Sequence, residues 1–121
     1  MPNVKNMRKW VKALRSGEYS QTHGKLKDDS GFCCLGVACD VSGVAAWKEG
    51  IFGIYYDESS LSLPSKVQSW LGININDPQL IGVRKQSATA TDLNDEKNYT
   101  FKQIANAIER RWPEVKEKRT K

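Results

Sequence analysis

The chain has 121 residues and a formal net charge of +5, and 39% of its residues are hydrophobic and 27% charged. This length and composition predict one small α+β domain over residues 1–121 and leave no room for a second core. No apolar run approaches the roughly 20 residues that a membrane-spanning helix needs, and the first residues lack the apolar core of a signal peptide. We therefore expect a cytoplasmic protein with no membrane partner, and the positive charge favours anionic partners.

An N-terminal amphipathic helix is predicted over residues 4–16. Its apolar residues recur at intervals of three and four and are Val4, Met7, Trp10, Val11 and Leu14. Asn3 suits the N-cap, and Gly17 lies where the helix should end. The opposite face carries cations and no acid, namely Lys5, Arg8, Lys9, Lys12 and Arg15. A solvated helix face normally mixes charges of both signs, so this face is the strongest candidate for contact with an anion.

The central part of the chain predicts short elements. The turn residues 28–31 indicate a hairpin, and residues 34–41 a short buried helix that Gly43 ends. The aromatic and β-branched content of residues 47–56 favours a strand. A further short helix is predicted over residues 63–71, with Pro64 in its first turn, where its missing N–H costs nothing.

The last third of the chain holds the best-defined helix. Thr100 and Gln103 form a capping box, and the apolar stripe that follows is Phe101, Ile104, Ala105, Ile108 and Trp112. Pro113 should end this helix, and we expect a frayed, charged tail over residues 114–121. The segments before the helix are predicted as a strand, a single helical turn and a polar loop, at residues 80–83, 90–93 and 94–98.

Three cysteines, Cys33, Cys34 and Cys39, lie close together, and His23 precedes them. These residue types suit zinc, but two adjacent cysteines on a strand point to opposite faces. We expect reduced thiols that pack as small hydrophobic side chains, with a zinc site as the alternative. No phosphate-binding loop and no pairing of nucleophile and base is present, so we expect no cofactor and no enzymatic activity.

Four sequence blocks occur in a characteristic order. They are W-V-x-A-L-R-S-G-x-Y-x-Q at residues 10–21, C-C-L-G-V-x-C-D at 33–40, a Leu-Pro helix with a Trp at 63–70, and Leu-Asn-Asp followed by F-x-x-I-A-x-x-I at 93–108. This order resembles a family of small, largely uncharacterised proteins encoded by tailed phages and prophages. The resemblance implies a viral origin and a setting in the host cytoplasm, and it carries over no catalytic residue. Accessory phage proteins often act on the host, including on its defences.

The leading hypothesis is a non-enzymatic phage accessory protein for host takeover or anti-defence. It would capture a small anionic nucleotide-type ligand or bind a host protein, with exposed tyrosines stacking beside the cations. The candidate ligand-binding residues are Lys5, Arg8, Lys9, Lys12, Arg15, Tyr19, Tyr55, Tyr56, Arg84 and Tyr99. The alternatives are a nucleic-acid-binding protein, an enzyme of unknown type, and a basic face that is merely solvated. The sequence leaves the oligomeric state open, a homo-oligomer included.

Overall fold

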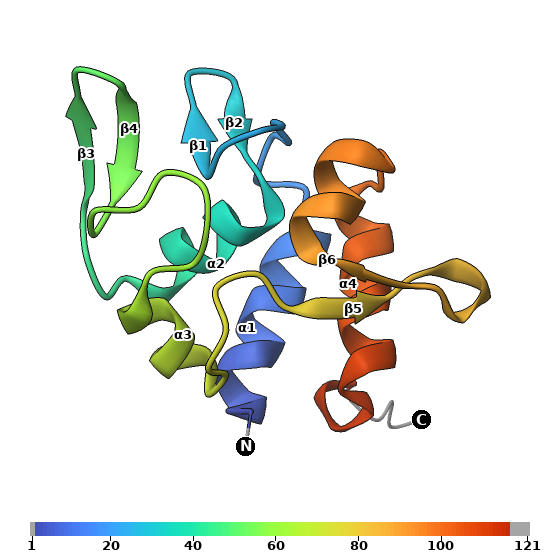
Figure 1. The fold of residues 1–121 in the computed structure, drawn as a ribbon. Helices are drawn as coiled ribbons and strands as arrows, with labels where there is room; N and C mark the ends of the chain where they lie inside the picture. Colours follow the sequence, from blue (N-terminus) through green and yellow to red (C-terminus); the bar gives the residue numbers. More distant parts are fainter. Residues whose placement is uncertain (1, 117–121) are drawn as a thin grey trace.

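The computed structural model describes residues 2–116, and these residues form an α+β fold, as predicted (Figure 1). The α-helices are α1 (Val4–Arg15), α2 (Cys34–Ser42), α3 (Ser65–Leu71) and α4 (Phe101–Arg111). The antiparallel sheets are three separate hairpins: β1 (Lys27–Asp28) with β2 (Gly31–Phe32), β3 (Trp47–Gly50) with β4 (Gly53–Tyr56), and β5 (Gln79–Ile81) with β6 (Ser87–Thr89). Short helical segments are η1 (Val83–Lys85), η2 (Asp92–Glu96) and η3 (Pro113–Val115). None of the helices within residues 2–116 has the length and apolar character needed to span a bilayer.

Helix α1 lies in the middle of the fold, with α2 and α3 on one side and α4 with η3 on the other (Figure 1). The predicted apolar stripe of α1 is buried, except that Val4 is only half-buried. The Asn3 side chain caps the helix as predicted, since its Oδ1 accepts from the Asn6 N–H at 3.0 Å. The Trp10 Nε1 donates to the Cys34 carbonyl at 2.9 Å and so joins α1 to α2.

Helix α2 is buried all round from Cys34 to Cys39, a wider buried surface than the single face predicted for it. The Cys33 Sγ caps it by accepting from the Gly36 N–H at 3.4 Å. A Cβ on Gly36 would lie 1.9 Å from the Leu26 carbonyl oxygen, so only glycine allows this close packing. Gly43 ends the helix in the left-handed conformation (φ +62°), as predicted.

The prediction of one strand over residues 47–56 is wrong, because the chain reverses direction in the middle of it. Trp47 pairs with Tyr56, and the pairing ends at Gly50 and Gly53, so Ile51 lies in the turn. Gly53 adopts φ +119°, which a side chain would disfavour. The two glycines therefore close a hairpin despite the high strand propensity of the residues between them.

The C-terminal region agrees with the prediction at α4 and departs from it on either side. Both hydrogen bonds of the capping box are present. The predicted polar loop at residues 94–98 is wrong at its start, where Asn94 is fully buried within η2. The predicted tail begins with the ordered segment η3, and Val115 is buried at 1% exposure. Residues 117–121 of that tail lie outside the described residues.

Smaller differences concern α3 and β5. Helix α3 begins at Ser65, so Pro64 is its N-cap rather than part of its first turn. The predicted strand at residues 80–83 is β5, which ends at Ile81, and Val83 belongs to the following turn.

Candidate anion-binding site

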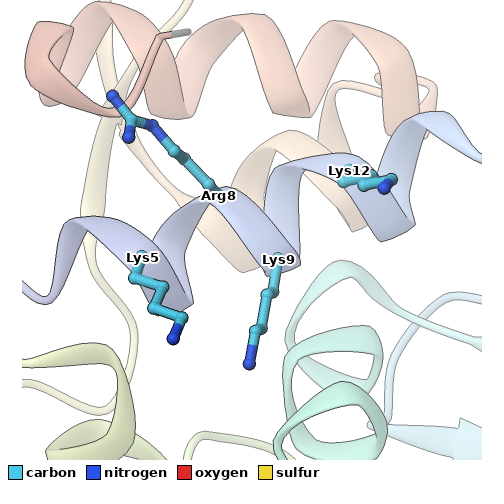
Figure 2. A pocket seen from close by; sticks show the side chains of 4 residues that line it. All are labelled: Lys5, Arg8, Lys9 and Lys12. Atoms are coloured by element: carbon cyan, nitrogen blue, oxygen red, sulfur yellow. The ribbon is translucent and has the colours of Figure 1, made fainter.

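Four cationic side chains of α1 line a surface recess of about 260 Å³ (Figure 2). They are Lys5, Arg8, Lys9 and Lys12, and we call them the basic face. Spacings of three and four residues place all four on one side of the helix. Figure 2 shows Lys5 and Lys9 extending in the same direction, away from α4, whereas Arg8 extends toward the segment that follows α4.

Arg8 is fixed by contacts with η3. Its Nε donates to the Val115 carbonyl at 3.0 Å, and its Nη2 donates to the Glu114 carbonyl at 3.1 Å. A guanidinium has five N–H donors, so three of them are left for another acceptor. Arg8 thus holds η3 against α1 and keeps its positive charge, because backbone carbonyls do not neutralise it.

Arg15, the fifth predicted cation, is not part of the recess. Its guanidinium forms an ion pair with Glu109 at 2.7 Å and donates to Asn106 Oδ1 at 2.7 Å. The hydrogen bond between them raises the pKa of Arg15 and lowers the pKa of Glu109. Arg15 therefore joins α1 to α4, and Glu109 compensates its charge.

The three lysines of the basic face are exposed and have no carboxylate partner within residues 2–116. The ion pairs in this part of the chain are Arg15–Glu109 and Lys66–Asp57. The adjacent helix α3 carries no acid. The only acid of α2 is Asp40, whose carboxylate accepts hydrogen bonds from Tyr19 and Trp47. The segment η3 carries Glu114, which contacts Arg8 through its backbone carbonyl and forms no ion pair with these lysines. Within residues 2–116 the recess is therefore a concentration of positive charge whose lysines have no ion-pair partner.

The predicted tyrosines do not gather at this recess. Tyr56 is buried at 1% exposure, and its hydroxyl accepts from the Ala45 N–H at 2.8 Å. The Tyr19 hydroxyl donates to Asp40 at 2.6 Å. Burial is the main cause, and this hydrogen bond the second, of the raised pKa of Tyr19. The Tyr99 hydroxyl accepts from the Val83 N–H at 3.0 Å, and Tyr55 lies on β4 opposite Lys48. The lining of the recess thus has no aromatic ring on which a base could stack.

Arg84 also lies outside the recess. It occupies the exposed turn between β5 and β6, a hairpin that Figure 1 shows projecting beside α4. Arg84 and Lys85 adopt φ values of +59° and +60°. Only Lys5, Arg8, Lys9 and Lys12 of the ten predicted ligand-binding residues are therefore brought together.

Comparison with known proteins places the sequence in a family. Residues 2–112 match a family described as a domain of unknown function, DUF8296. The chain belongs to this family. No curated protein and no solved structure matches it. The match includes the whole basic face, so the recess lies within the DUF8296 domain.

The cysteines of this DUF8296 domain are free thiols in the core. Burial raises the pKa of Cys33 to about 11 and also raises the pKa values of Cys34 and Cys39. These thiols are protonated at neutral pH and pack as small hydrophobic groups. His23 is exposed, and in the part of the chain that the structure describes no three His, Cys, Asp or Glu side chains are placed so that they could hold a metal ion.

Asn94 is an important residue that the sequence analysis placed in a loop. Its Oδ1 accepts from Gln21 Nε2 at 2.8 Å and from the Cys34 N–H at 3.3 Å. Its Nδ2 donates to the Thr22 carbonyl at 2.9 Å and to Asp95 Oδ1 at 2.7 Å. The feature of the sequence that could have pointed to Asn94 is its position between Leu93 and Asp95 in the last of the four sequence blocks. Asn94 joins η2 to the start of α2 and so supports the fold rather than the recess.

Proposed function

We propose that this DUF8296 protein is a non-enzymatic binding protein whose basic face docks on an acidic surface of another protein. The observation that carries the proposal is that Lys5, Lys9 and Lys12 are exposed around one recess and have no carboxylate partner in residues 2–116. Positive charge that is not paired within the described residues attracts negatively charged partners and steers their approach.

A small nucleotide ligand is less well supported than a protein surface. Nucleotide sites usually combine a concave, largely apolar pocket with a few convergent polar groups. The recess is instead lined by four long cationic side chains. The tyrosines that would stack on a base form hydrogen bonds elsewhere or lie on β4.

Nucleic acid is also less well supported. A recognition helix must project far enough to enter the major groove, whereas α1 is packed between α2, α3, α4 and η3 and exposes only a narrow strip. Four cations would neutralise about four phosphates, fewer than the six to ten contacts of proteins whose affinity for DNA falls steeply with salt. Carboxylate side chains that project from a protein surface can reach the lysines around the recess.

The sequence resemblance to small tailed-phage proteins supports a setting for this binding. In that setting the protein is phage-encoded and acts in the host cytoplasm as a host-takeover or anti-defence factor, with a host protein as its target. The flexible lysines can adjust to carboxylates at several positions.

A charge-reversal pull-down tests the proposal. The wild type, K5E/K9E/K12E and K25E/K97E/K102E are each used to capture proteins from a bacterial host lysate, and the purified partner is then titrated. The control lysines are also exposed, and both variants have the same net charge. We expect the basic-face variant alone to lose binding, and wild-type binding to weaken with salt.

Equal loss of binding in both variants, or none in either, would show that the basic face is not the docking site. Thermal shift with cyclic dinucleotides, DNA and RNA tests the alternatives. A ligand at 100 times its Kd should stabilise the protein by roughly 2.7 kcal/mol. Such a shift, if K5E/K9E/K12E abolishes it, would replace the protein partner by that ligand.

A further inference from the structure

The turn between β3 and β4 exposes two large apolar side chains. Ile51 is 96% exposed and Phe52 is 98% exposed. The next most exposed large hydrophobic residue within residues 2–116 is Leu61, at 62%. Figure 1 shows this turn at the end of the hairpin that points away from α3.

Neither the turn nor the core requires apolar residues at these two positions. Gly53 supplies the positive φ of the hairpin, and Ile51 and Phe52 both have negative φ. Turn positions of this kind accept most residue types. Polar side chains would close the same turn without leaving apolar surface in water. Ile51 and Phe52 are adjacent and together form a contiguous apolar patch, and such patches are a feature of interaction sites.

The base of the hairpin is held firmly, so the tip has a defined position. Trp47 and Tyr56 are paired across the strands, and their ring centroids are 4.8 Å apart. Tyr56 is buried, and the Trp47 Nε1 donates to Asp40 at 3.0 Å. A tip presented on a rigid base loses little conformational entropy when it binds.

We infer that Ile51 and Phe52 form an anchor that inserts into an apolar pocket on another protein. Two side chains cannot supply the roughly 1,200–2,000 Å² that a stable interface buries, which argues against a dimer formed through the tip alone. A single aromatic anchor in a pocket can nevertheless carry much of the binding energy of a larger contact. The flanking residues, Lys48 and Glu49, have opposite charges, so the tip lacks the cluster of cations that anionic lipid attracts.

The anchor is independent of the basic face, and site-specific photo-crosslinking tests it. Photoreactive benzoylphenylalanine replaces Phe52 or, as the matched control, Leu61, and the protein is irradiated in bacterial cells. We expect one protein to be crosslinked from position 52 and not from position 61. That protein is then purified, and its affinity is measured for the wild type, I51S/F52S and L61S.

The expected result is binding at least about tenfold weaker for I51S/F52S and unchanged for L61S. The melting temperature of I51S/F52S should stay within about 2 °C of the wild-type value, because both side chains lie in water. The inference would be overturned by equal crosslinking from both positions, by crosslinking only between copies of this chain, or by unchanged affinity of I51S/F52S. Cosedimentation with phosphatidylglycerol–phosphatidylethanolamine vesicles that I51S/F52S abolishes would overturn it in favour of a membrane.

Discussion

Replacement of Asn94 by alanine should be among the most destabilising changes in this protein. Asn94 is fully buried and makes four hydrogen bonds, two through each polar atom of its side chain. Gln21 and Asp95 are only half-buried and can turn to water. The Cys34 N–H and the Thr22 carbonyl would remain buried without a partner.

The size of the effect follows from those two groups. An unsatisfied buried polar group costs about 1–3 kcal/mol, so Asn94→Ala should lower the free energy of unfolding by about 3 kcal/mol. That is a large part of the 5–15 kcal/mol typical of a domain. For a chain of this length it corresponds to a fall in Tm of about 10–15 °C.

Urea and thermal denaturation, followed by tryptophan fluorescence, measure this change. Asn74→Ala is the matched control, since Asn74 is exposed, and it should change stability by less than about 0.5 kcal/mol. Asn94→Asp should also destabilise at neutral pH, because a second carboxylate would face Asp95. A loss below about 1 kcal/mol in Asn94→Ala would refute the reasoning from unsatisfied groups.

Three further predictions concern the backbone and a titrating side chain. Arg84 and Lys85 occupy left-handed positions of a hairpin turn that favours Asn-Gly. The free energy of unfolding of R84N/K85G, measured by urea denaturation, should therefore be about 1–2 kcal/mol higher than that of the wild type. No increase would mean that the Arg84 and Lys85 side chains stabilise the turn. Hydrogen bonds, chiefly from Ser30, lower the pKa of Asp28 to about 2. The stability that the ionised carboxylate contributes above pH 4 should therefore be lost as the pH falls toward 2. Urea titrations in acid should show a flatter pH dependence for Asp28→Asn. Gly36→Ala would place a Cβ 1.9 Å from a backbone carbonyl oxygen, so its circular dichroism melt should show severe destabilisation, and a near-wild-type Tm would contradict this packing.

The helices were predictable because their signals are local. The N-cap at Asn3 and the capping box at Thr100 depend on residues three positions away, and the apolar stripes repeat within single helices. The hairpin of β3 and β4 was missed for the opposite reason. Strand propensity at Ile51 and Phe52 competes with a chain reversal that depends on the backbone conformation of Gly53.

The candidate site was predictable only in part. Helical spacing placed Lys5, Arg8, Lys9 and Lys12 on one face, and the structure brings these four residues together. Arg15 is drawn away from this face, and Arg8 is fixed, by contacts with residues far along the chain. The sequence separations of these contacts are 91 and 107 positions. Polar neighbours in the sequence did not show where the tyrosine rings would lie, because tertiary packing decides whether such a ring is exposed.

The basic face also has a cost for folding that can be measured separately from binding. Lys5 lies in the first turn of α1, where a positive charge opposes the helix dipole. It also lies three and four residues before Arg8 and Lys9, so like charges repel along the helix. Lys5→Glu reverses all three interactions and should raise the free energy of unfolding by about 1 kcal/mol.

If the proposed function is right, the same variant should bind the acidic partner proposed above more weakly. Lys102→Glu on α4 is the comparison, because Lys102 is exposed but lies outside the recess. Urea denaturation and titration of the partner then give stability and affinity for each variant. Lys5→Glu, unlike Lys102→Glu, should gain stability and lose affinity. This result would mean that the basic face favours binding at the expense of helix stability. A loss of stability in Lys5→Glu would contradict the electrostatic argument, and unchanged affinity would remove Lys5 from the docking surface.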